Sequence, residues 1–155
     1  MLSIKKFLQK NLPPYDHAIG YAQTLLFPLF LLVLRSFTAH IFLMSALEKI
    51  EDALKGDWYK VIFLYTTVHP VPLLSPAVAA ILGTGSEIIF AVMLILGLGT
   101  RFASAGLVTV AIVATISIGY YPTHTFWFLL LGVTLFTGGG LYSIDAIIRK
   151  WVRDE

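Results

Sequence analysis

The stretch of residues 102–144 contains no Asp, Glu, Lys or Arg, and this feature limits the possible folds of the chain more than any other. About 20 apolar residues in a helix cross the ~30 Å hydrocarbon core of a bilayer, so the stretch is too long for one crossing. Residues 119–124 carry two tyrosines and a proline, which are typical of a turn at the membrane interface. We therefore expect two membrane-spanning helices here, at about residues 102–118 and 125–141.

Two further apolar runs, residues 25–47 and 76–98, are each long enough to cross a bilayer. Because 57% of the residues are hydrophobic and 13% are charged, lipid rather than water is the expected solvent for most of the chain. The sequence thus predicts an all-α membrane protein, a four-transmembrane-helix bundle that forms a single domain over residues 1–155. Between the first two spans, residues 53–75 mix aromatic and charged side chains and predict an extramembrane loop with one amphipathic helical piece.

The two ends of the chain predict short helices outside the spans. Ile4, Phe7 and Leu8 stand beside two lysines and predict a helix on the membrane surface, without the pattern of a removable signal peptide. Ser143 is the expected N-cap of a final helix that leads into a basic tail. With four spans, the two termini and the Arg101 turn lie on one side of the membrane and carry seven Lys and Arg residues, whereas the first loop on the other side carries three. Because Lys and Arg are enriched on the cytoplasmic side, both termini are expected to be cytoplasmic.

The composition also excludes several classes of function. A net charge of +2 and aromatic residues set within apolar runs do not form a nucleic-acid surface. The absence of cysteine rules out disulfides, thiolate metal sites and iron–sulfur clusters carried by this chain. Neither a phosphate-binding loop nor a nucleophile with a neighbouring base is found. Any redox chemistry would therefore need a borrowed, non-covalent cofactor such as a quinone.

Arg35 and Glu87 are the charged residues inside the predicted spans. At 1.5 Å per residue, they lie about 15 Å and about 16 Å from opposite sides of the bilayer, so we expect them to pair near its middle. Such a pair either lines a site for a polar ligand, a proton or a quinone head group, or it is a structural pair that fixes helix register. Gly83 and Ala91, four residues before and after Glu87, predict a close helix contact.

Three histidines fall at similar depths: His40 in the first span, and His69 and His124 near the outer ends of their segments. A haem or metal site would need two of them on facing helices, and spans three and four add no carboxylate, so we predict no metal site. His40, Met44 and Glu48 recur every four residues, either as a proton path or with His40 as a satisfied interior histidine. We favour the second interpretation.

Three stretches of the sequence resemble the DoxX family of small bacterial membrane proteins. They are residues 32–37 (LVLRSF) leading to 47–50 (LEKI), residues 85–101 (GSEIIFAVMLILGLGTR), and residues 138–145 (GGGLYSID). The middle stretch is the most specific, because an intramembrane Glu followed ten residues later by Gly and then by Thr-Arg is uncommon. The residues that match the recurring charged positions of the family are Arg35, Lys49, Glu87, Arg101 and Asp145.

The resemblance implies a four-helix bundle in the bacterial inner membrane and a redox setting. Family members look like membrane components of oxidoreductase assemblies, and related DoxD proteins serve a thiosulfate:quinone oxidoreductase. We therefore expect a membrane subunit of an oxidoreductase, linked to a quinone and to sulfur-compound or oxidative-stress metabolism, with a soluble or peripheral redox partner. Family members often carry a further acidic or histidine residue in the later spans, whereas this chain has His124 at the loop.

Other functions remain open at this stage. The principal alternative is a non-enzymatic membrane scaffold or small-molecule channel, in which the Arg35–Glu87 pair is structural. A homo-oligomer is compatible with a bundle of four short helices. A proton-coupled transporter is disfavoured, because the chain shows no convincing internal repeat.

Overall fold

The computed structural model describes residues 16, 17 and 19–154, and every regular element in these residues is a helix. A short π-helical turn, η1 (Ala22–Leu26), leads directly into the first long helix. The other elements follow in chain order: α2 (Phe27–Leu54), α3 (Trp58–Thr67), α4 (Pro76–Leu96), α5 (Thr100–Ile118), α6 (Pro122–Thr137) and α7 (Ile144–Arg153). The predicted surface helix around Ile4 and Phe7 lies outside the described residues.

Three helices are long and apolar enough to cross a membrane: Ile19–Leu54, Pro76–Leu96 and Thr100–Ile118. The last two agree with the predicted spans within a few residues. The first is 36 residues long and extends past both ends of the predicted span at residues 25–47. The charged residues that end the apolar run do not end the helix, because charged side chains are tolerated in a helix once it leaves lipid for water.

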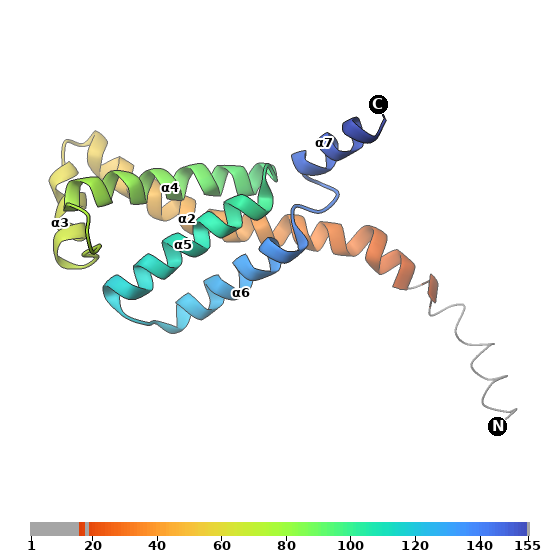
Figure 1. Cartoon of the computed structure of the whole chain (residues 1–155), viewed down its shortest axis with the longest axis horizontal. Coiled ribbons are helices and arrows are strands. Elements are labelled where there is room, and N and C mark those ends of the chain that lie inside the picture. The colour runs from red at the N-terminus through yellow and green to blue at the C-terminus, as the bar shows by residue number, and fades with distance from the viewer. Residues whose placement is uncertain (1–15, 18, 155) are drawn as a thin grey trace, which may run out of the picture.

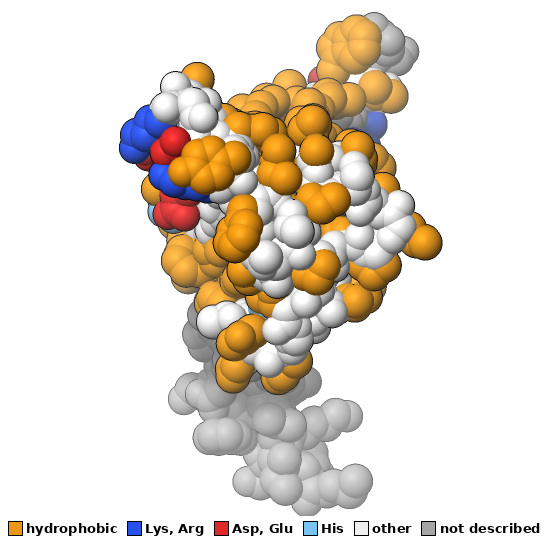
Figure 2. Space-filling model, turned by 90° about the vertical axis from the view of Figure 1, so that its left-hand side faces the viewer, with side chains coloured by type: hydrophobic (Ala, Val, Ile, Leu, Met, Phe, Trp, Pro, Cys, Tyr) orange, Lys and Arg blue, Asp and Glu red, His pale blue; other side chains and the backbone are white. Residues whose placement is uncertain are grey.

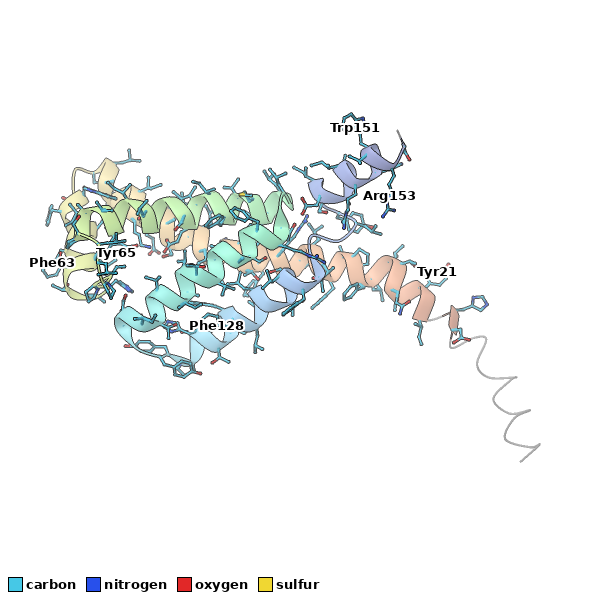
Figure 3. All side chains as sticks on the ribbon, in the orientation of Figure 1. Tyr21, Phe63, Tyr65, Phe128, Trp151 and Arg153 are labelled. Carbon is cyan, nitrogen blue, oxygen red and sulfur yellow. The ribbon has the colours of Figure 1, made fainter. Side chains whose placement is uncertain are left out.

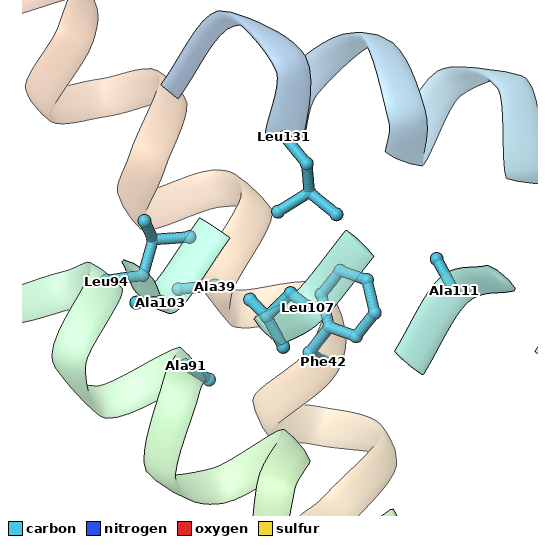
Figure 4. Close-up of a cluster of buried hydrophobic side chains, with 8 residues drawn as sticks. All are labelled: Ala39, Phe42, Ala91, Leu94, Ala103, Leu107, Ala111 and Leu131. Carbon is cyan, nitrogen blue, oxygen red and sulfur yellow. The ribbon is translucent and has the colours of Figure 1, made fainter. Parts of the chain in front are cut away.

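The four helices α2, α4, α5 and α6 pack around one another, with α3 across one end and α7 at the other (Figure 1). A cluster of buried side chains lies between them (Figure 4). Its members are Ala39, Phe42, Ala91, Leu94, Ala103, Leu107, Ala111 and Leu131. Half of them are alanines, which bring the helix backbones close together, as small residues do in membrane bundles. Ala91 lies in this cluster, as expected for a residue at a helix contact.

Large hydrophobic side chains cover much of the outside of the bundle. Phe63, Ile81 and Phe102 are each at least 60% exposed, and many others on the long helices are at least partly exposed. Figure 2 views the α3 end, where charged side chains gather at one edge of a mostly hydrophobic and neutral surface. Contiguous exposed apolar surface of this extent is rare on soluble monomers and fits a surface that faces lipid.

Local sequence signals set the ends of these helices. Pro76 begins α4 in its first turn, where the missing N–H costs no helix bond. Gly97 ends α4 in the left-handed conformation, with φ of 67°, so that α5 can start three residues later. The Ser143 side chain accepts a hydrogen bond from the Ala146 N–H, which confirms the predicted N-cap of α7. The predicted helical piece of the first loop is confirmed as α3.

Candidate functional site

Arg35 is buried at the end of the bundle where α4, α6 and α7 meet, and is 2% exposed. Its Nη1 atom donates a hydrogen bond of 3.1 Å to the Gly139 carbonyl, and Nη2 donates to the Tyr142 carbonyl. These carbonyls belong to the loop between α6 and α7, where no helix satisfies them. Arg35 thus ties α2 to this loop, since a guanidinium can serve two acceptors at once.

Asp145 completes this arrangement by capping α5. Its carboxylate accepts hydrogen bonds from the Gly99 N–H at 2.7 Å, the Thr100 N–H at 2.9 Å and the Thr100 hydroxyl at 2.9 Å. The Asp145 N–H in turn donates to the Gly97 carbonyl at 3.0 Å. A carboxylate at a helix N-terminus is favoured by the free N–H groups and by the helix dipole. We call Arg35, Gly97, Thr100, Gly139 and Asp145 the loop clamp.

The predicted pairing of Arg35 with Glu87 is wrong. Arg35 lies at the level of Gly97, whereas Glu87 lies ten residues earlier in α4, about 15 Å away along the helix. The depth of Arg35 was counted from the start of the apolar run at Leu25. However, the first turns of the helix extend past the ends of α4 and α6 (Figure 1), so the count placed Arg35 too deep in the bundle.

Glu87 pairs instead with Lys49. The Lys49 ammonium lies 2.8 Å and 2.7 Å from the two carboxylate oxygens of Glu87, and it also donates to the Ser45 hydroxyl at 3.2 Å. The side chains of Lys49 and Glu87 are 14% and 9% exposed. A charge removed from water needs a partner and further hydrogen bonds, and both are supplied here by neighbouring turns of α2 and α4. The pair holds these two helices together.

Tyr65 of α3 lies against this pair. The Lys49 ammonium is 6.0 Å from the centre of its ring, within the range of a cation–π contact. Gly83 makes room for the ring, because a Cβ atom there would lie 2.2 Å from the Tyr65 hydroxyl oxygen. Burial raises the pKa of Tyr65 to about 12, and the nearby Glu87 carboxylate adds to the shift. In Figure 3 Tyr65 lies on the side of α3 that faces the bundle, with Phe63 on the other side.

A cavity of about 630 Å³ opens beside the Lys49–Glu87 pair. Its polar lining consists of Ser45, Glu48, Lys49, Asp52, Tyr65, His69, Ser86, Glu87, Thr109, Ser117 and the indole of Trp127. The rest of the lining is apolar and comes from α2 to α5 and the loop before α4. The volume lies within the usual range for small-molecule sites, which are mostly apolar with a few placed polar groups. We call this the Lys49–Glu87 cavity.

The rim of the Lys49–Glu87 cavity has two different sides. Glu48 is exposed and lines the cavity together with Asp52 and His69, at the end of the bundle where α3 lies. Leu82 of α4 and Thr109 of α5 also line the cavity and are exposed, on helices that spread apart from their shared turn (Figure 1). The cavity therefore has both a polar edge and an edge on the apolar outer surface. This combination suits a ligand with a polar head and an apolar body.

The three histidines do not gather into one site. His40 is exposed and does not line the Lys49–Glu87 cavity, so its interpretation as an interior histidine is wrong. His69 lines the cavity, where burial, Lys49 and His124 lower its pKa. His124 is 1% exposed, with Nδ1 3.0 Å from the Thr115 hydroxyl and its ring 4.8 Å from that of Trp127. Within residues 16, 17 and 19–154, no three His, Asp or Glu side chains form a metal-binding group.

Sequence reasoning missed the partner of Glu87 and the part played by Tyr65. Lys49 matches a recurring charged position of the DoxX family, but it stands just past the apolar run at residues 25–47, a place that is typical of a side chain in water. Gly83 gave a usable signal, because a small residue one turn from a buried charge predicts a close neighbour. That neighbour is the Tyr65 ring rather than another long helix. Arg101 lies apart from the cavity and donates to the Phe136 carbonyl at 3.2 Å.

The fold and the site together define a multi-pass helical membrane protein with a cavity built around a buried ion pair. The sequence model of the DoxX family matches residues 30–120, more than half of the chain, and the protein belongs to this family. The match includes Arg35, Lys49, Glu87 and Arg101. No curated protein and no solved structure matches the chain significantly.

The loop clamp predicts that Gly97 and Gly99 respond differently to the same substitution. Both have left-handed backbone, but a Cβ at Gly97 would lie 1.9 Å from Arg35 Nη1 and 2.5 Å from Ser143 Cβ, whereas a Cβ at Gly99 would meet the end of the Met93 side chain at 3.3 Å. Gly97→Ala should lower the free energy of unfolding in detergent by about 2 kcal/mol more than Gly99→Ala, because the hydrogen-bonded Arg35 yields less readily than a methionine end. Equal losses, measured by circular dichroism during denaturant titration, would contradict the clamp.

Asp145 predicts an acid-sensitive contribution to stability. Burial alone would raise the pKa of Asp145, but the hydrogen bonds from Thr100 and Gly99 outweigh it and lower this pKa. The unfolded-state pKa is about 3.9, so the contribution is complete above that value and is lost as the pH falls through the lower folded-state pKa. Between about pH 5 and pH 2, the wild type should lose stability more steeply than Asp145→Asn. If the free energy of unfolding falls equally with pH in the wild type and in Asp145→Asn, the carboxylate contributes nothing to stability.

Proposed function

We propose that this protein is the membrane subunit of an oxidoreductase assembly and that the Lys49–Glu87 cavity binds the head group of a lipid-soluble quinone. The observation that carries the proposal is one cavity with a charged pair on an otherwise mostly apolar lining. A quinone has the same division, with two carbonyl oxygens on a ring and a long apolar tail. Membership of the DoxX family supports a redox setting rather than defining one.

The chemistry of the cavity fits this ligand in three ways. The Lys49 ammonium has three N–H groups and would donate to a quinone carbonyl in place of its bond to Ser45 while keeping its contact with Glu87. The Trp127 ring, which packs against Phe42 with centres 5.6 Å apart, offers an aromatic wall for the quinone ring. The exposed edge at Leu82 and Thr109 gives the tail a way out toward lipid.

Electrons would come from a partner. The chain has no cysteine for a cluster or dithiol, so the quinone would be a non-covalent cofactor and a soluble or peripheral protein would supply the electrons. Reduction of a quinone to a quinol consumes two electrons and two protons. We place this reaction in sulfur-compound or oxidative-stress metabolism, in keeping with the redox setting implied by the resemblance to the DoxX family.

The proposal includes a membrane arrangement with α6 as the fourth span. α6 has 16 residues and would be about 24 Å long, so it needs the loop residues at its ends to complete the crossing. It packs against α5 and α2 as a member of the bundle. With four spans both termini would lie on one side, and the excess of Lys and Arg there supports the cytoplasmic side, in what we propose is a bacterial inner membrane.

A scaffold or channel with a structural ion pair is the second candidate, with Lys49–Glu87 in the place of the predicted Arg35–Glu87 pair. It is favoured by the contacts that already satisfy the pair, since Lys49 bonds both Glu87 oxygens and Ser45. An ion pair whose hydrogen bonds are already formed within the protein can hold two helices together without a ligand. The open cavity beside the pair is what this candidate leaves unexplained.

A binding titration separates the two candidates. Purified protein in detergent is titrated with short-tailed menaquinone and ubiquinone analogues, beside Lys49→Gln and Glu87→Gln, with folding checked by circular dichroism. We expect saturable binding that weakens about tenfold or more in each folded variant, because Lys49→Gln removes the charged donor to the quinone and Glu87→Gln removes the carboxylate that holds this donor in place. The matched control is the Glu51→Gln, Lys55→Gln double variant, which removes an exposed pair of α2 outside the cavity and should bind normally.

The opposite results support the second candidate. Binding that is absent, or that is indifferent to both substitutions, would contradict a quinone site at the pair. In that case Lys49→Met combined with Glu87→Leu should keep the fold, because a buried pair replaced by apolar groups of similar size is often neutral or stabilising.

A further inference from the structure

The most amphipathic element of the described chain is α7, at the end of the bundle opposite the Lys49–Glu87 cavity. Its apolar side chains recur at the i, i+3, i+4 and i+7 spacing that places them on one face of a helix. They are Ile144, Ile147, Ile148 and Trp151, with Val152 beside them. Ile147, Trp151 and Val152 are each more than 60% exposed, and no residue of α7 is buried. Most of the apolar face is thus uncovered by this chain, with Ile144 and Ile148 partly covered.

The opposite face of α7 is basic. Arg149, Lys150 and Arg153 are all exposed. At 100° per residue, Arg149 and Arg153 lie about 160° from Trp151, and Lys150 lies about 100° from it, at the side of the helix. Asp145, the acidic residue of the first turn, is already engaged with Gly99 and Thr100 in the loop clamp. The exposed surface of α7 therefore carries three positive charges, and the acidic residues Asp154 and Glu155 follow the helix end in the sequence.

The loop clamp holds α7 at the end of the bundle where the first long helix begins. There η1 and the start of α2 expose Leu25, Leu26, Phe27 and Phe30, each by about half or more. Figure 1 shows this segment and α7 at the same end of the molecule. Apolar side chains on both elements indicate that hydrocarbon reaches this end, and a helix with an apolar face and a basic face lies at the boundary between hydrocarbon and head groups.

We propose that α7 lies on the bilayer surface and binds the head groups of anionic lipids through Arg149, Lys150 and Arg153. Ile147, Ile148 and Trp151 enter the boundary of the acyl region, where tryptophan is favoured because its ring is apolar and its N–H is polar. Anionic lipids are the expected ligand of the basic face because of its charge, since each Lys or Arg near an anionic membrane surface is appreciably attracted to that surface. This surface is separate from the cavity and does not depend on what the cavity binds.

The test places the full chain in nanodiscs of phosphatidylcholine, with or without phosphatidylglycerol, and uses lipids brominated near the head group as quenchers. The difference in tryptophan emission between the wild type and Trp151→Phe isolates the signal of Trp151. We expect that signal to be quenched by the shallow bromine label more than by a label at the end of the acyl chain. Trp151 is exposed, so its replacement should leave the fold intact.

Lipid preference tests the basic face. Native mass spectrometry of the protein, extracted with its bound lipids, should show a preference for phosphatidylglycerol over phosphatidylcholine. Replacing Arg149, Lys150 and Arg153 by Gln should reduce that preference about fivefold for each charge removed. The matched control, Lys55→Gln with Lys60→Gln, removes two exposed lysines near α3 that are already paired with acidic residues, and should leave the preference unchanged.

Three results would overturn the proposal. A Trp151 signal that is insensitive to both bromine labels would place α7 away from lipid. Protection of Trp151 that depends on protein concentration, but not on the labels, would assign the face to a second copy of the chain. An unchanged lipid preference after the triple substitution would contradict head-group binding by the basic residues even if Trp151 is quenched.

Discussion

The Lys49–Glu87 pair is the interaction on which the rest of the structure depends. A charge inside a bilayer is costly unless a partner lies within reach, so one turn of α2 and one turn of α4 must stay together. Their contact sets how closely the long helices pack, which the alanines of the core permit. The pair is also a polar group in an apolar environment. The Tyr65 ring packs against this pair, in the space that Gly83 leaves.

The two ends of the bundle differ in their physical character. At one end, Arg35 and Asp145 form hydrogen bonds with backbone groups of the turns between helices. Arg35 and Ser143 approach Gly97 closely, which leaves little free space there. At the other end, α4 and α5 spread apart, and the polar groups border a cavity. Rigid connections at one end and free space at the other allow a ligand to bind without disturbing the packing that positions the site.

Hydropathy was sufficient to predict the membrane class and, within a few residues, the helices Pro76–Leu96 and Thr100–Ile118. The capping preference of serine predicted the N-cap at Ser143. Hydropathy failed for the pairing of Arg35, because the depth of a residue was inferred from the edge of an apolar run. The helix itself runs from Ile19 to Leu54, so that edge carries no information on where neighbouring helices end. The long Lys49 side chain hid the true partner, since a lysine just past an apolar run can reach back toward a buried carboxylate. Tertiary contacts between α3 and α4 leave no periodic signal in one sequence, which is why Tyr65 was missed.

Charge exchange tests most directly whether Lys49, and not Arg35, is the partner of Glu87. Unfolding in detergent is followed for Lys49→Glu, Glu87→Lys and their combination, and for Arg35→Glu combined with Glu87→Arg. The account predicts that each single reversal is strongly destabilising, and that the Lys49→Glu, Glu87→Lys combination recovers much of the loss because the opposite charges again meet. The Arg35→Glu, Glu87→Arg combination should recover nothing. Recovery in the Arg35 combination, or its absence in the Lys49 combination, would contradict the account.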